Sequence, residues 1–124
     1  LRTSKYINMT DLLRVAMRSR PDRILVGEVR DKAALDMLKS WNTGCPGGIA
    51  TVHANSTEAA ILRISSLAQE ANIPPPNHLI AETIDVVINI VREPSHPCGR
   101  RVKQVSELLS FEGDKFHFNH VGEQ

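Results

Sequence analysis

The apolar segment of residues 24–27 (Ile-Leu-Val-Gly) constrains the fold of this chain more than any other stretch. Pro21 and Asp22 break the chain before it, and Arg30-Asp31 opens a helical pattern after it. A short apolar run between turn signals is typical of a strand that is buried on both faces of a parallel sheet. We therefore expect a strand at residues 24–29, with Glu28 close to its carboxyl end.

Two further apolar runs, residues 49–52 and 85–91, repeat this pattern, and segments with helical periodicity separate the three runs. Strands that alternate with helices predict a mostly parallel sheet flanked by helices, an α/β fold with right-handed crossovers. The end of the chain differs. Residues 102–109 and 115–120 flank a Glu-Gly-Asp turn, which predicts an antiparallel hairpin that extends the edge of the sheet.

Capping residues mark where the expected helices begin. Asn8 or Thr10 is a suitable N-cap for a helix over residues 9–17, Asp31 for one over residues 32–42, and Ser56 for a third. Gly44 would end the second helix. A last short helix is expected at residues 78–83. Apolar spacing predicts which side chains face the core: Met9, Leu12, Leu13, Ala16 and Met17 in the first helix, Ala34, Leu35, Leu38 and Trp41 in the second, and Ala60, Ile61, Ile64, Leu67 and Ala68 in the third.

The composition is that of one soluble globular domain. The chain has 124 residues, 41% apolar and 23% charged, with no membrane-spanning run. Cys45 and Cys98 do not form a disulfide framework, which favours reduced thiols in the cytoplasm. Because the chain begins at Leu1 rather than Met, we expect a fragment of a longer protein.

The charge is close to balanced overall but uneven along the chain. A net charge of +1 argues against a large nucleic-acid-binding surface, and no basic stripe is evident. The first 30 residues nevertheless hold seven basic residues against three acidic ones (Arg2, Lys5, Arg14, Arg18, Arg20, Arg23 and Arg30 against Asp11, Asp22 and Glu28). This local positive field suits an anion such as phosphate, and it also fits a solvated helix face.

Glu28 and His53 each follow an apolar run at the point where a strand ends. Parallel neighbouring strands would bring both side chains to one edge of the sheet, where the N-termini of the following helices favour anions. There Glu28 could position or deprotonate a water, or hold Mg²⁺ through a water, and His53 could donate to a terminal phosphate oxygen. The alternatives are a solvated glutamate that closes a strand and a structural histidine.

Other polar residues point to chemistry less strongly. Arg14, Arg18 and Arg30 could reach a nucleotide phosphate or a neighbouring subunit, or could form surface ion pairs with Asp11 or Asp31. Two further pairs, His96 with Cys98 and His117 with His120, have no complete zinc-ligand spacing, so we expect no zinc site.

The 124 residues contain no G-x-x-x-x-G-K-[ST] phosphate loop. If the chain acts on a nucleotide, we expect this loop to lie upstream of Leu1. Otherwise the chain is not part of a nucleotide hydrolase.

Two motifs resemble those of the traffic ATPases of type II and type IV secretion, and within that family the conjugal-transfer ATPases of the type IV group. Residues 18–30 resemble the segment that ends in the Walker B motif, with Glu28 at the acidic catalytic position. Residues 41–56 resemble the histidine box, with His53 as its histidine. The resemblance runs from Thr3 to about Leu109. Cys45 stands where the family commonly has another histidine.

The resemblance implies that residues 1–124 are the C-terminal half of a RecA-like P-loop ATPase domain, without its Walker A loop. The complete protein would be a hexameric ring at the cytoplasmic face of the inner membrane, docked on the secretion or conjugation machinery. It would use ATP and Mg²⁺ to power conjugative DNA transfer through subunit motion, and the isolated chain would be inactive. The competing hypotheses are a non-catalytic α/β interaction module and a phosphate-binding enzyme of another type.

Overall fold

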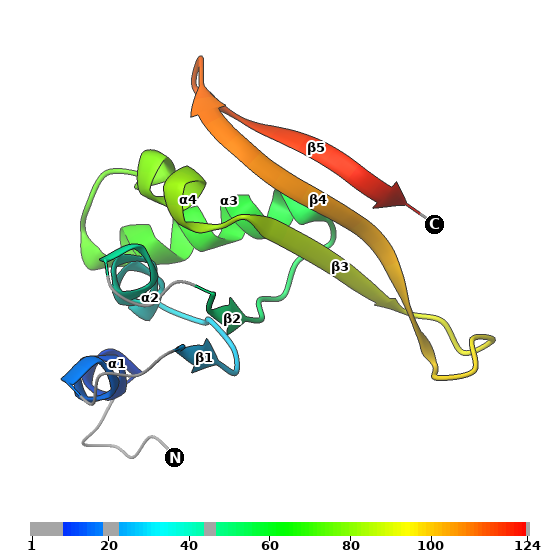
Figure 1. Ribbon diagram of the computed structural model, residues 1–124, viewed down its shortest axis with the longest axis horizontal. Helices are drawn as coiled ribbons and strands as arrows, with labels where there is room; N and C mark the ends of the chain where they lie inside the picture. The colour runs from blue at the N-terminus through cyan, green and yellow to red at the C-terminus, as the bar shows by residue number, and fades with distance from the viewer. Residues whose placement is uncertain (1–8, 19–22, 44–46, 124) are drawn as a thin grey trace.

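The computed structural model describes residues 9–18, 23–43 and 47–123 of the chain. Its helices lie on one side of a long antiparallel sheet, and a short parallel sheet lies beside them (Figure 1). The elements follow one another as α1 (Met9–Arg18), β1 (Leu25–Val26), α2 (Ala33–Thr43), β2 (Ile49–Ala50), α3 (Thr57–Ala68), the 3₁₀ turn η1 (Gln69–Ala71), α4 (Asn77–Thr83), β3 (Val86–Arg92), β4 (Arg100–Glu112) and β5 (Lys115–Glu123).

The parallel sheet pairs the first two apolar runs, as the sequence predicts. Leu25 lies opposite Ile49 and Val26 opposite Ala50. Both strands are shorter than expected, and burial on both faces was a wrong prediction. Val26 is 6% exposed and belongs to the core, whereas Leu25 and Ile49 are 68% and 67% exposed. The reason is that only one face of this two-stranded sheet packs against the core.

Two of the predicted N-caps are confirmed by side-chain hydrogen bonds. The Asp31 carboxylate accepts from the Ala33 amide at 2.8 Å, and the Ser56 hydroxyl accepts from the Ala59 amide at 3.0 Å. Thr10 lies inside α1 and donates to the Asp36 carboxylate at 3.0 Å, so it ties α1 to α2 instead of capping α1. Asn8 and Gly44 lie outside the described residues.

The core lies between α2, α3 and α4. The predicted α3 stripe is confirmed, since all five of its residues are buried. Ala34, Leu35 and Leu38 of α2 are buried too, and Trp41 is half-buried against the core. The Trp41 indole donates to the Ile24 carbonyl at 3.2 Å. A Cβ at Gly48 would lie 2.1 Å from the indole nitrogen, so glycine there permits this close approach.

Replacing Leu38 with alanine should lower the free energy of unfolding of the complete protein by about 2–5 kcal/mol. Leu38 is 0% exposed, so the substitution removes buried carbon atoms and leaves a cavity. Denaturant unfolding measures the change. Leu62→Ala is the matched control because Leu62, on α3, is 61% exposed. An equal effect of the two substitutions would contradict the core described above.

The predicted C-terminal hairpin is confirmed, but it pairs with β3 in a separate sheet and does not extend the edge of the parallel sheet. β4 and β5 pair antiparallel and are joined by a tight turn, in which Gly113 and Asp114 have positive φ values of 61° and 59°. Such a turn matches the right-handed twist of the two strands.

The third apolar run does not join the parallel sheet, which corrects the sequence prediction. β3 pairs antiparallel with β4, in the order β3-β4-β5. Only residues 93–99 connect β3 to β4, and a parallel pairing needs a crossover of a dozen or more residues. The outward side chains of Val86, Ile88 and Ile90 are 52–57% exposed, so this strand too is covered on one face alone.

Within the described residues, no helix combines the length and the apolar composition that crossing a bilayer requires.

Candidate functional site

Glu28 lies just beyond β1, where it contacts two basic side chains. Its carboxylate is 3.5 Å from Nε2 of His53 and 3.4 Å from Nε of Arg30. The Glu28 side chain is 33% exposed. The structure therefore brings together the glutamate and the histidine that sequence reasoning singled out, at one end of the parallel sheet.

Backbone pairing beyond the two short strands holds this geometry. The Val29 amide donates to the Thr51 carbonyl at 2.8 Å, which continues the parallel pairing of β1 with β2. The Thr51 hydroxyl also donates to the Gly27 carbonyl. These two bonds tie the backbone next to Glu28 to the backbone two residues before His53. Thr51 was not among the residues predicted for the site, although a threonine within an apolar run is a recognisable signal.

The ion pairs at Glu28 contribute little to folding. His53 is 91% exposed and Arg30 is 77% exposed, so water screens both contacts. Exposed pairs of this kind stabilise a protein by about 0–1 kcal/mol. A carboxylate, an imidazole and a guanidinium that meet in water-accessible space can instead orient a water, move a proton and offset negative charge on a bound anion.

Of the predicted basic residues, Arg30 lies at this point in the described part of the chain. Arg30 pairs with Glu28 rather than with Asp31. Arg14 is exposed on α1. The side chain of Arg18, like Cys45, lies outside the described residues.

The two helix N-termini near the site already have acceptors from their own chain. Asp31 accepts from the start of α2. At the start of α3, Ser56 accepts from Ala59, and the Gln104 side chain accepts from the Thr57 amide at 3.3 Å. An anion at this edge would therefore be held by side chains more than by free amides of these helices.

No group of three or more histidine, cysteine, aspartate or glutamate side chains in the described part of the chain could hold a metal ion. His96 and Cys98 contact one another at 3.2 Å in an exposed turn, and the His117 imidazole contacts the Glu112 carbonyl at 3.0 Å. His120 makes contacts of its own with Ser106 and Glu58.

Comparisons with known proteins identify the family to which this α/β chain belongs. The model of the type II/IV secretion system protein family matches residues 2–122. The chain belongs to this family, which confirms the resemblance drawn from residues 18–30 and 41–56.

Curated relatives point the same way. A probable conjugal transfer protein, TrbB, of Sinorhizobium fredii is 46% identical over 116 residues, which are 94% of this chain and 35% of that protein. The conjugal transfer protein TrbB of Rhizobium radiobacter is 41% identical over 99% of this chain and 37% of its own length. The type IV secretion system protein PtlH of Bordetella pertussis is 32% identical over 80% of this chain and 31% of its own length. The chain thus spans about a third of the length of these relatives.

Solved structures share the fold. The VirB11 ATPase of the Brucella suis type IV secretion system superposes with a TM-score of 0.72 at 26% identity, over 81% of this chain and 32% of that one. The DotB ATPase of Yersinia pseudotuberculosis superposes with a TM-score of 0.56 at 25% identity, over 85% of this chain and 26% of that one.

Proposed function

We propose that this chain is the C-terminal half of a RecA-like P-loop ATPase domain that powers type IV secretion or conjugative DNA transfer. The observation that carries the proposal is the 3.5 Å contact between Glu28 and His53 at the ends of two adjacent parallel strands. In an open α/β sheet, ligands bind just beyond the carboxyl ends of the strands. The family membership and the fold shared with two ATPases support nucleotide hydrolysis as the chemistry.

Glu28 is the residue suited to activate the attacking water. Its carboxylate is partly exposed, and Arg30 and His53 reach different oxygens, Oε2 and Oε1. A carboxylate oxygen accepts a hydrogen bond from water and can take up its proton. In-line attack on a terminal phosphate requires a water held in this way.

His53 and Arg30 supply positive or proton-donating groups beside that carboxylate. Negative charge spreads over the oxygens of the transferred phosphoryl group in the transition state. An imidazole N–H from His53 directed at such an oxygen would stabilise this charge. Arg30 adds charge in the same region, and Arg14 and Arg18 are further candidates for contact with the nucleotide or a neighbouring subunit.

The residues fit a magnesium–nucleotide complex that is completed from outside this chain. Mg²⁺ prefers oxygen ligands and keeps several waters, and proteins often hold it through one or two carboxylates together with substrate phosphates. Glu28 offers one such carboxylate, directly or through a water. Bound Mg²⁺ would neutralise phosphate charge. The phosphate loop would come from the part of the longer protein that this chain does not include.

The exposed apolar side chains also fit a larger assembly. Leu25 and Ile49 leave the outer face of the parallel sheet uncovered, which is the pattern expected where further parts of a domain pack. By the family resemblance, the complete protein would form a hexameric ring at the cytoplasmic face of the inner membrane, with the secretion machinery as its partner.

The first test is ATP hydrolysis by the purified complete protein. We expect phosphate release that requires Mg²⁺ and stops when EDTA removes the metal. The reason is that the side chains of the site are too few to neutralise the phosphate charge of ATP without the metal. Residues 1–124 alone should release no phosphate, since they lack the phosphate loop.

Absence of ATP hydrolysis by the complete protein in its assembled state would contradict the proposal and favour a non-catalytic interaction module. Hydrolysis of a phosphate compound that is not a nucleotide, without ATP hydrolysis, would instead favour another type of phosphate-binding enzyme.

A further inference from the structure

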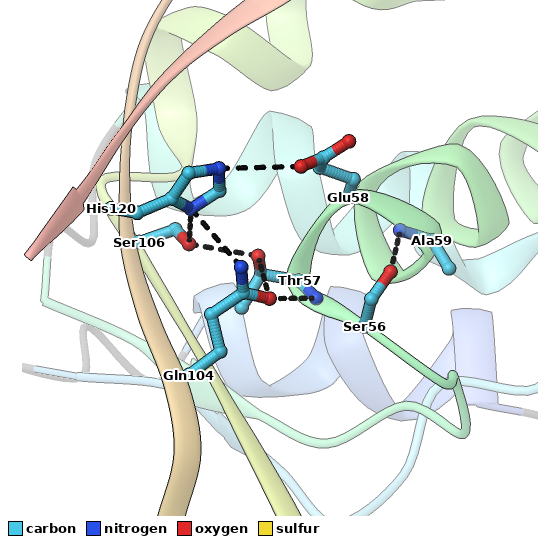
Figure 2. Close-up of polar contacts among 7 residues, drawn as sticks. All are labelled: Ser56, Thr57, Glu58, Ala59, Gln104, Ser106 and His120. Atoms are coloured by element: carbon cyan, nitrogen blue, oxygen red, sulfur yellow. Dashed lines mark hydrogen bonds and ion pairs between the residues drawn. The ribbon is translucent and has the colours of Figure 1, made fainter. Parts of the chain in front are cut away.

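A network of polar side chains joins the start of α3 to the antiparallel sheet (Figure 2). Thr57 Oγ1 donates to Oε1 of Gln104 at 2.9 Å and lies 2.8 Å from Oγ of Ser106. Ser106 Oγ lies 2.6 Å from Nδ1 of His120, and Nε2 of His120 lies 3.3 Å from the Glu58 carboxylate. These five residues, called here the α3 network, connect α3 to the β4–β5 hairpin, which is distant from it in the sequence.

The strand register explains why β4 and β5 present polar atoms to α3. Side chains alternate between the two faces of a strand, so Gln104, Ser106 and Leu108 lie on the same face of β4. Leu108 belongs to the hydrophobic core, which shows that this face is the inner one. His120 lies directly opposite Ser106 on β5, and its ring stacks on Phe118 at an interplanar angle of 8°.

Burial makes these hydrogen bonds specific. Thr57 and Ser106 are both 0% exposed, so their hydroxyl groups have no access to water in place of the partners described. A buried hydroxyl without a partner is costly. The network therefore fixes the position of the first residue of α3 relative to β4 and β5.

The same contacts fix the backbone at the start of α3. The Thr57 amide is among the first amides of the helix, which have no partner within it, and it donates to Oε1 of Gln104 at 3.3 Å. The Ser56 cap then satisfies the Ala59 amide from the other side. Thus two acceptors, one from the preceding loop and one from β4, hold this end of the helix.

His53 lies between this fixed point and the one at Thr51. Thr51 is bonded to Gly27 and Val29 through its side chain and its carbonyl, and Thr57 is bonded to the antiparallel sheet. Five residues separate the two threonines. Because the His53 side chain is 91% exposed, packing does little to orient it, and its placement depends on its backbone.

We propose that Thr57 is a positioning residue for His53. Gln104, Ser106 and His120 hold Thr57 in place. The β4–β5 hairpin thereby couples to the candidate site: a change in the position of the hairpin moves the start of α3 and with it the His53 segment. The proposal rests on the function proposed above, in which His53 acts on a phosphate, but the network itself can be tested without that function.

The experiment compares variants of the complete protein. Thr57→Val keeps the shape of the side chain and removes its hydroxyl, and Thr57→Ser restores the hydroxyl. Ser65→Ala is the matched control, because Ser65 is also buried on α3 and donates to Asn77 at 3.0 Å, but lies two turns away from the start of the helix. Ser106→Ala removes the link to His120 from the other side, should Thr57→Val fail to fold.

We expect Thr57→Val to lower kcat for ATP hydrolysis about five- to tenfold with little change in KM, since a small displacement of a catalytic group chiefly affects the chemical step. Thr57→Ser should recover most of the activity, and Ser65→Ala should keep it. In a His53→Ala background, Thr57→Val should cause no further loss, because a residue that acts through His53 has nothing left to position.

Amide hydrogen exchange, followed by mass spectrometry over residues 52–60, provides a readout that is independent of catalysis. We expect faster exchange there in Thr57→Val and Ser106→Ala than in Ser65→Ala or the unchanged protein. Unchanged exchange would overturn the network as an anchor of this segment. Faster exchange with unchanged kcat, equal losses in Thr57→Val and Ser65→Ala, or a full further loss in the His53→Ala background would overturn the positioning role. If the protein hydrolyses no ATP, the function proposed above fails, and the exchange data still decide whether the network anchors the segment.

Discussion

Replacing Glu28 with glutamine in the complete protein is expected to lower kcat for ATP hydrolysis by about 10²–10⁴-fold. Glutamine keeps the size and one oxygen of the side chain but is not basic, so it cannot accept a proton from the attacking water. ATP binding should remain, since the bulk of the binding contacts would come from the phosphate loop and not from this carboxylate. Phosphate release measures turnover, and equilibrium binding of a fluorescent ATP analogue measures affinity.

The fold should tolerate this change. Glu28 loses its ion pairs with Arg30 and His53, but both partners are exposed to water, so the free energy of unfolding should fall by no more than about 1 kcal/mol. Glu70→Gln is the matched control, because it makes the same chemical change at an exposed residue of η1. Turnover at the unchanged rate in Glu28→Gln, or an equal decrease in Glu70→Gln, would refute the assigned role.

Much of the fold follows from local signals in the sequence. Asp31 and Ser56 have side chains that bond to amides two and three residues further on, and the structure shows those bonds. The spacing of apolar residues in α3 is enough to predict which face of the helix is buried. The Gly113-Asp114 turn fixes a hairpin with its own geometry. In each case the information lies within one element, so the sequence is sufficient.

The sheet topology was harder to predict, because the composition of an apolar run does not indicate which strand it pairs with. Residues 85–91 resemble a buried parallel strand by composition, yet β3 pairs antiparallel with β4 and exposes Ile88 and Ile90. The length of the following connection was the available signal, since residues 93–99 are too few for a crossover. Burial on both faces failed for Leu25 as well, because burial depends on what packs on the sheet and not on the strand alone.

The Glu28–His53 contact and the α3 network differ in the same way: the first follows from local signals in the sequence, and the second depends on how distant elements pair and pack. Glu28 and His53 each follow a strand, so parallel pairing alone predicts that they meet, and they lie 3.5 Å apart. The α3 network depends instead on the register of β4 against β5 and on the packing of α3 against that sheet. The signal for this network in the sequence was the presence of polar residues at the core-facing positions 104 and 106. Their partners at positions 57 and 120 could not be predicted without the structure.

Replacing His53 with alanine should separate catalysis from stability. Loss of a donor to a developing oxyanion lowers kcat by about 10²-fold or more, which corresponds to about 2.7 kcal/mol of transition-state stabilisation. The free energy of unfolding should change by no more than about 0.5 kcal/mol, since the side chain is 91% exposed. Steady-state kinetics and denaturant unfolding of the same preparations give the two quantities on one energy scale.

Two further variants identify the chemical group responsible. His53→Gln keeps an N–H donor near the same position and should retain more activity than His53→Ala, whereas a role in packing alone would not distinguish them. His117→Ala removes an exposed histidine of β5 that contacts the Glu112 carbonyl, and it should leave kcat unchanged. If His53→Ala lowers the transition-state stabilisation and the free energy of unfolding equally, the histidine is structural. Glu28 would then have to act without its neighbour, and the α3 network would have no catalytic side chain to position.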